Sequence, residues 1–195
     1  KNNTLSDVEL FELANNHISN NNLETALVEL DKIEVLFPSS EYANKSILLA
    51  AYIHFLKKDY EKTRAITENY KKFYPGSMNI IYANYLEAMT YFVLIKKSDY
   101  SQKNAIKALE KFIFIQNAYP NNKYEIDIIT KIRAINNNLA QSKLKTAQYY
   151  IEKNNINGAL IYLKDIFENH NSSTAIEKTL FLLTKLYFEI EEFEI

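Results

Sequence analysis

The three histidines of this chain are its side chains best suited to metal binding or acid–base catalysis. A zinc site needs about four ligands, which in proteins are mostly cysteine and histidine side chains. The chain has no cysteine, and His17, His54 and His170 lie far apart in the sequence. We therefore expect no metal site, and we expect the three imidazole rings to pack between helices or at a turn.

Motifs for covalent or cofactor chemistry are not found in the sequence. It has no nucleophile elbow, phosphate-binding loop or dinucleotide fingerprint, and two glycines are too few to build one. Carboxylates gather near the C-terminal end, at Glu191, Glu192 and Glu194, and a run of like charges is usually a solvated surface. We expect no catalytic residue and no cofactor, so the sequence predicts a protein that is not an enzyme.

Aromatic side chains are the other abundant group that could contact a ligand or partner. The chain has fifteen tyrosines and eleven phenylalanines but no tryptophan. Tyrosine is common at protein interfaces because it buries a large ring and keeps a polar end. The formal net charge of -1 gives no general attraction to nucleic acid or to anionic lipid. The composition therefore favours contacts with other proteins.

A recurrent spacing indicates the elements that carry these aromatic residues. At four places a small residue lies twelve positions before a turn, and three of the turns are an aromatic residue followed by proline. The pairs are Ala26 with Pro38, Thr63 with Pro75, Ala108 with Pro120, and Ala159 with Asn171. A tetratricopeptide repeat is a helix pair of about 34 residues, with a small residue at the helix crossing and proline after the second helix. The spacing predicts an all-α fold, an α-solenoid of about five tetratricopeptide-like helix pairs, the last incomplete.

Apolar residues at i, i+3, i+4 and i+7 predict the individual helices. The expected helices cover about 6–19, 23 to the turn at Phe37, 40–57 and 60–73, and another begins near Thr174. One long helix, or two in series, is expected over about 124–153, and an extended loop near 96–104. No partner follows the last helix, so either it caps the solenoid or the chain is truncated.

No stretch is apolar enough to suggest a membrane-spanning helix, which needs about 18 or more apolar residues. The most apolar window, from Ile80 to Ile95, is interrupted by Asn84, Glu87 and Thr90. This window predicts a core helix.

Three segments resemble a known family: NIIYANYLEAMTYF at 79–92, YPNNKYEIDIITKI at 119–132 and LAQSKLKTAQYYIEKNNINGAL at 139–160. The family is BamD, also called YfiO or ComL, the tetratricopeptide lipoprotein of the bacterial outer-membrane β-barrel assembly (BAM) machinery. The resemblance extends from about Val8 to Tyr187. Its most specific parts are the turn at 119–121 with Tyr124, and the AQYY motif at 147–150 with Glu152.

The resemblance implies a single solenoid over 1–195 at the periplasmic face of the outer membrane. A lipidated cysteine upstream of Lys1 would be its only link to the membrane. It also implies other BAM lipoproteins as partners, unfolded outer-membrane proteins as clients of repeats 6–120, and docking of repeats 121–195 on a POTRA domain of BamA. Two features depart from the family: an arginine- and aspartate-rich loop shrinks here to KKSDYSQK, and Tyr162 stands where family members often have arginine.

Two sets of candidate contact residues follow. In tetratricopeptide geometry the first helix of each pair lines the concave face, which here presents Val8, Phe11, Asn15 and Ile18, then Lys45, Leu48, Tyr52 and Phe55, then Tyr82, Tyr85, Met89 and Phe92. From these we predict a client-peptide groove of Phe11, Tyr52, Phe55, Tyr82, Tyr85 and Met89. The resemblance implies a BamA-docking surface of Tyr149, Glu152, Tyr162 and Asp165.

Other interpretations remain open at this point. Each groove aromatic could instead pack against neighbouring helices, and one of Tyr149 and Tyr150 must fill a helix crossing because adjacent helical residues face different ways. The chain could also be another tetratricopeptide adaptor, for example for a chaperone tail, although such adaptors usually present lysine, arginine and asparagine on the concave face. A periplasmic cell-envelope scaffold is the third interpretation.

Overall fold

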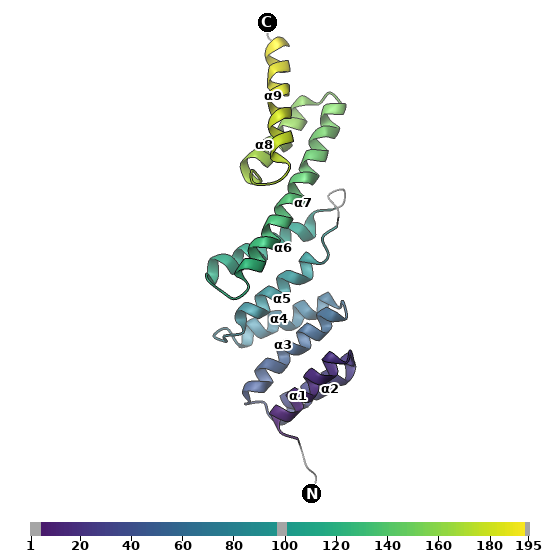
Figure 1. The fold of residues 1–195 in the computed structure, drawn as a ribbon, viewed down its shortest axis with the longest axis vertical. Coiled ribbons are helices and arrows are strands. Elements are labelled where there is room, and N and C mark those ends of the chain that lie inside the picture. The colour runs from purple at the N-terminus through teal and green to yellow at the C-terminus, as the bar shows by residue number, and fades with distance from the viewer. Residues whose placement is uncertain (1–4, 97–100, 194–195) are drawn as a thin grey trace. The chain divides into compact units, whose positions relative to one another are not determined.

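The computed structural model describes residues 5–96 and 101–193, and over these ranges the chain forms α-helices without any strand (Figure 1). The helices are α1 (Asp7–Ser19), α2 (Leu23–Leu36), α3 (Glu41–Leu56), α4 (Tyr60–Phe73), α5 (Ile80–Phe92), α6 (Lys103–Ala118), α7 (Glu125–Glu152), α8 (Ile156–Asn169) and α9 (Ile176–Phe193). The predicted all-α fold of consecutive helix pairs is confirmed. Of the extended loop expected near 96–104, residues 97–100 lie outside the described ranges, as does Glu194. The side chains of Glu191 and Glu192 also lie outside them.

The turns that join α1 to α2, α3 to α4 and α7 to α8 share one backbone geometry. Asn21, Lys58 and Asn154 each have a positive φ, of 58°, 62° and 55°. In each turn the following residue donates its backbone N–H to a carbonyl five positions earlier, at 2.8–2.9 Å. This is the arrangement of a Schellman motif, in which a left-handed residue ends a helix. Asparagine tolerates the left-handed region better than most residues, so the chain makes these turns without glycine.

The turns between pairs also repeat. Helices α2, α4, α6 and α8 end one residue before Phe37, Tyr74, Tyr119 and His170, whose φ values are −132°, −127°, −135° and −135°. In three cases proline follows, and the residue before proline is driven out of the helical region by the proline ring. The aromatic–proline spacing therefore marks these helix ends correctly.

Small residues lie at the helix crossings, as the spacing predicted. Ala26, Thr63, Ala108 and Ala159 are all 0% exposed. Overpacking a tight crossing strains the neighbouring side chains. A residue without a bulky side chain at these positions allows the two helices of a pair to approach each other closely.

Contacts divide the chain into two compact units, residues 1–90 and 91–195. In the first unit, α1, α2 and α3 pack together around Leu10, Ala14, Leu30 and Ile33, and α4 packs on α3. In Figure 1, α4 lies behind α3 and α5. The predicted single solenoid over 1–195 stays a prediction.

In the second unit, α7 is one continuous helix of 28 residues, which decides between the two alternatives left open by the sequence. Both α6 and α8 pack against it, and α9 packs on α8. Around its middle, Asn136 Oδ1 lies 3.1 Å from His170 Nδ1, and Asn137 Oδ1 accepts from the Thr174 backbone N–H at 3.0 Å, both in the α8–α9 turn. Asn138 Nδ2 donates to the Lys96 carbonyl at 3.1 Å, in the segment before α6. These polar contacts tie both neighbouring turns to an unbroken helix. No helix in the described ranges is both long and apolar enough to cross a membrane.

Candidate functional site

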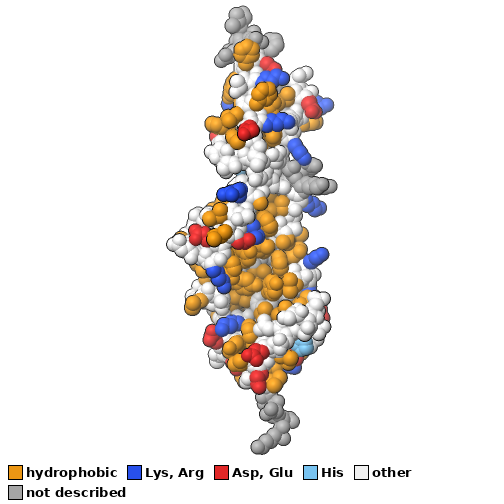
Figure 2. Space-filling model, viewed as in Figure 1, with side chains coloured by type: hydrophobic (Ala, Val, Ile, Leu, Met, Phe, Trp, Pro, Cys, Tyr) orange, Lys and Arg blue, Asp and Glu red, His pale blue; other side chains and the backbone are white. Residues whose placement is uncertain are grey.

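A small apolar hollow lies on the first unit, among helices α1, α3 and α5. Its cavity volume is about 190 Å³, and we call it the aromatic hollow, lined by Phe11, Lys45, Leu48, Leu49, Asn79 and Tyr82. Figure 2 shows hydrophobic side chains gathered over α3 and α5 on the face in view. An engineered apolar cavity of about 150 Å³ holds benzene, so the aromatic hollow has room for about one aromatic ring.

Periodicity explains why these side chains meet. Lys45 and Leu48 are three positions apart on α3, and residues at i and i+3 lie on one face of a helix. Phe11 comes from α1 and Tyr82 from α5, each the first helix of its pair. Phe11 also contacts the ring of Tyr42, with 5.2 Å between ring centroids.

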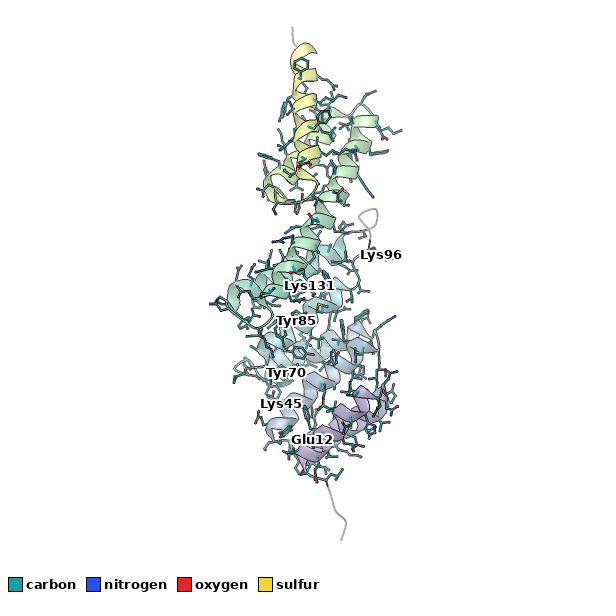
Figure 3. The ribbon with its side chains drawn as sticks, viewed as in Figure 1. Glu12, Lys45, Tyr70, Tyr85, Lys96 and Lys131 are labelled. Carbon is teal, nitrogen blue, oxygen red and sulfur yellow. The ribbon has the colours of Figure 1, made fainter. Side chains whose placement is uncertain are left out.

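Lys45 is the one charged side chain of the aromatic hollow among the residues described. Its Nζ lies 2.7 Å from Glu41 Oε1 and 5.0 Å from the centroid of the Tyr42 ring. The hydrogen bond to Glu41 raises the pKa of Lys45, so the ammonium group stays charged at neutral pH. Figure 3 labels Lys45 on α3 and Tyr85 on α5. A ligand in the hollow would therefore meet an apolar wall and a single cation.

The structure brings together two of the six predicted groove residues, Phe11 and Tyr82, in this hollow. Phe55 instead packs on Tyr60 of α4, with 5.6 Å between ring centroids. The others, Tyr52, Tyr85 and Met89, are half-buried on α3 and α5 and do not line the hollow.

Two lining residues, Leu49 and Asn79, were not among the sequence candidates. Leu49 is the neighbour of Leu48 along α3 and lies outside the four concave positions used for prediction. Asn79 precedes the first residue of α5, where the helical period gives no signal. Only the geometry of the preceding turn places Asn79 against α3.

A tyrosine ladder, Tyr149, Tyr150 and Tyr162, joins α7 to α8 in the second unit. The ring centroids are 5.9 Å apart between Tyr149 and Tyr150, and 5.7 Å between Tyr150 and Tyr162, the second pair stacked at 19°. Tyr150 and Tyr162 pack against the core, whereas Tyr149 is 54% exposed. Tyr150 therefore fills the crossing, and Tyr149 faces outward.

The two predicted acidic docking residues have different surroundings. Glu152 is exposed at the end of α7. Asp165 is half-buried, forms an ion pair with Lys143 and accepts a hydrogen bond from Asn169 Nδ2 at 2.6 Å. Burial opposes ionisation, but the bonds from Lys143 and Asn169 outweigh it and lower the pKa of Asp165. Of the four predicted docking residues, Tyr149 and Glu152 are the accessible pair.

Two of the three histidines are buried, and His17 on α1 is half-buried. His54 is 5% exposed and His170 is 6% exposed. His170 Nδ1 lies 3.1 Å from Asn136 Oδ1, and its Nε2 lies 3.0 Å from Lys143 Nζ. Burial first, and then the Lys143 charge, lower the pKa of His170. Within the described ranges no group of three or more histidine, aspartate or glutamate side chains could hold a metal ion.

The chain is an α-solenoid protein of the tetratricopeptide-like class. Its consecutive helix pairs, the small residues at their crossings and the repeated turn geometry define this class. The profile of the YfiO family, described as an outer membrane lipoprotein, matches residues 3–193. The chain therefore belongs to the BamD/YfiO family, as its sequence motifs predicted.

Curated relatives carry the name outer membrane protein assembly factor BamD. The protein of Rickettsia prowazekii (strain Madrid E) is 28% identical over 162 residues, which cover 83% of this chain and 64% of that protein. The protein of Caulobacter vibrioides is 26% identical over 181 residues, covering 93% of this chain and 59% of the relative. That of Neisseria gonorrhoeae is 23% identical over 194 residues, covering 94% and 73%. The chain thus spans about three fifths of the length of the first two relatives.

Proposed function

We propose that the chain is a non-enzymatic scaffold of outer-membrane protein assembly. Membership of the BamD/YfiO family over residues 3–193 supports this role, as do relatives named as outer membrane protein assembly factors. In this proposal the protein works at the periplasmic face of the outer membrane, held there by a lipid anchor upstream of this segment. Its partners are BamA, other BAM lipoproteins and unfolded outer-membrane proteins.

The client site in this proposal is the aromatic hollow, and the observation that carries it is the convergence of Phe11, Leu48 and Tyr82 beside one lysine. Unfolded barrel proteins expose aromatic side chains that a folded barrel places in contact with lipid. The hollow fits one such ring, and the flanking half-buried Tyr85 and Met89 on α5 extend the apolar surface for neighbouring side chains.

The BamA-docking surface in this proposal is centred on Tyr149 and Glu152. An exposed aromatic ring held by its neighbours loses little conformational freedom on binding, and such rings often dominate interface energies. The edge-on contact with Tyr150 and the ammonium of Lys153, 5.8 Å from the Tyr149 ring centroid, hold this ring in place. Tyr162 and Asp165 support α8 behind it.

Client binding is tested by titrating the chain with a ten-residue C-terminal peptide of a barrel protein from the same organism, ending in an aromatic residue. We expect Leu49→Trp, which fills the hollow, to weaken binding about tenfold, since a lost aromatic anchor costs about 1–2 kcal/mol. Replacing the terminal aromatic residue by alanine should have a similar effect. Val35→Ala, at a 72% exposed position on α2, is the matched control. Equal affinity of both peptides would exclude the aromatic hollow as the client site.

Docking is tested by titration with the POTRA domains of BamA from the same organism. We expect Tyr149→Ala to weaken binding about tenfold, a typical loss for an interface aromatic residue. Phe73→Ala, at a 76% exposed position in the first unit, should leave the affinity unchanged. Absence of any binding by the unsubstituted chain would instead favour the adaptor or envelope-scaffold interpretation.

A further inference from the structure

A second hollow lies between α2 and α4, on the side of α3 opposite the aromatic hollow. Its cavity volume is about 350 Å³, and α3 contributes Ala50 and His54 to its lining. With about 100° of rotation per helical residue, these two positions lie on the face of α3 opposite Lys45 and Leu48. We call this cavity the acidic hollow, after the three carboxylates that α2 contributes to it: Glu24, Asp31 and Glu34.

Two of these carboxylates have no cation of their own. Glu24 forms an ion pair with Lys57. Across residues 5–96 and 101–193, no ion pair or hydrogen bond is found for the side chain of Asp31 or Glu34. Burial and the nearby charge of Asp31 raise the pKa of Glu34, so the carboxylate form costs more free energy here than in a solvated side chain. Like charges at this helical spacing repel each other, and an external cation would relieve that repulsion.

The other lining residues of the acidic hollow on α2 and α3 carry no charge. Leu27, Val28 and Ala50 supply aliphatic surface, and Val28 is 54% exposed. His54 lines the hollow at 5% exposed, and its buried Nδ1 has no hydrogen-bond partner in the described part of the chain. Asp59 Oδ2 is 3.7 Å from that atom, beyond hydrogen-bonding distance. Burial lowers the pKa of His54, so at neutral pH the ring is uncharged and does not repel a cation.

We propose that the acidic hollow receives an arginine or lysine side chain from a partner protein, with its charged end at Asp31 and Glu34. Long basic side chains lay their methylene groups on apolar surface while the cation reaches a polar group. Val28 and Ala50 offer that apolar surface, and the two carboxylates lie at its edge. Arginine fits best because its planar guanidinium can bond two carboxylate oxygens at once. This surface is separate from both sites of the proposed function.

Lys62, on the α4 wall, provides a control of opposite sign. Its ammonium group weakens the attraction of the hollow for an incoming cation, whereas Asp31 and Glu34 strengthen it. Removing the lysine charge should therefore tighten binding of a basic side chain, and removing the two carboxylates should abolish it. A merely apolar patch would respond to neither change.

The test is a titration followed by NMR amide shifts of the whole chain, which at 22.8 kDa is suited to the method. The probes are three capped tripeptides, acetyl-Leu-Arg-Leu-amide and its Gln and Glu counterparts. We expect saturable amide shifts at Val28 and Asp31 with the Arg peptide. The Gln peptide should bind at least fivefold more weakly, and the Glu peptide should not bind. Asp31→Asn with Glu34→Gln should abolish the response, and Lys62→Gln should tighten binding about twofold.

Three results would overturn the proposal: equal responses to the three peptides, a response unchanged in the double variant, or no saturable response to the Arg peptide. Spermidine is a further probe. If spermidine displaces the Arg peptide at a concentration below the one at which the Arg peptide itself binds, the hollow is a site for small polycations instead. The double variant should keep the affinity of the unsubstituted chain for the barrel-protein peptide. Failure of this inference is thereby distinguished from failure of the proposed client site.

Discussion

A methyl group at Gly158 would disturb the packing of α7 against α8. A Cβ atom at this position would lie 2.8 Å from Tyr150 Cδ1 and 3.1 Å from Asn155 Cγ. Tyr150 is fixed between Tyr149 and Tyr162, so it has little room to move away. Overpacking of this kind costs about 1–3 kcal/mol. We expect Gly158→Ala to lower the free energy of unfolding by that amount in urea denaturation followed by circular dichroism.

Gly76→Ala is the matched control, because a Cβ atom there meets no atom within 4 Å and its φ is not positive. Its unfolding free energy should stay the same or rise slightly, since alanine reduces the freedom of the unfolded chain. Equal destabilisation by the two substitutions would contradict the packing explanation.

His170 makes stability depend on pH. Burial and Lys143 lower its pKa below the ordinary value of 6.5, so the unfolded chain binds this proton more readily than the folded one. The contribution of neutral His170 to the free energy of unfolding is present above pH 6.5. It is lost as the pH falls from 6.5 through the pKa of His170 in the folded chain. We expect the melting temperature to fall between pH 7.5 and 5, and His170→Gln to make that fall shallower. An unchanged pH profile in the variant would exclude His170 as a source.

At the scale of single elements, the turn at Lys58 is the least favourable of the three left-handed turns described within helix pairs. Asn21 and Asn154 occupy the equivalent positions with the same sign of φ. Asparagine adopts this region more readily than lysine because its short side chain can bond locally. We expect Lys58→Asn to raise the free energy of unfolding, measured in urea, by up to about 1 kcal/mol, part of the cost of the left-handed conformation for a residue such as lysine. The reverse change, Asn154→Lys, should lower the free energy of unfolding by a similar amount. If both substitutions raised it, or both lowered it, this explanation would be wrong.

Helix ends and crossings could be predicted from the sequence because each depends on local chemistry. The aromatic–proline turns end helices through the proline ring, and Ala26 and Thr63 are small because two helices cross there. The continuity of α7 could not be predicted, because the same apolar spacing fits one helix or two in series. The bonds of Asn136, Asn137 and Asn138 to segments far along the chain could not be predicted either. Helical periodicity cannot indicate which partner an asparagine finds.

The binding surfaces were only partly predictable for the same reason. Phe11 and Tyr82 could be assigned to one face by their repeat positions, and they meet in the aromatic hollow. Phe55 also has a concave-face repeat position, but its ring packs on Tyr60 of α4 and does not line the hollow. The acidic hollow was not predicted at all, because nothing in the sequence shows that Asp31 and Glu34 lack a cation while Glu24 pairs with Lys57.

At the scale of the whole molecule, the two units should lose structure separately. Helical repeats are stabilised mainly by their immediate neighbours, and residues 1–90 and 91–195 have their own buried clusters. We expect Leu163→Ala to accelerate amide hydrogen exchange in α7–α9 more than in α1–α3. Leu30→Ala should have the reverse effect, since both leucines are 0% exposed. Equal acceleration of both units by either variant, measured by mass spectrometry, would show that the chain unfolds as one.

Helix α3 is a wall shared by the aromatic hollow on one face and the acidic hollow on the other. An occupant that shifts or stiffens this helix changes the free energy of binding at the opposite face. Thermodynamic linkage makes that influence reciprocal, so a client that weakens the basic partner is itself weakened by that partner to the same factor. A single helix of 16 residues could thus make client capture and partner binding cooperative or mutually exclusive.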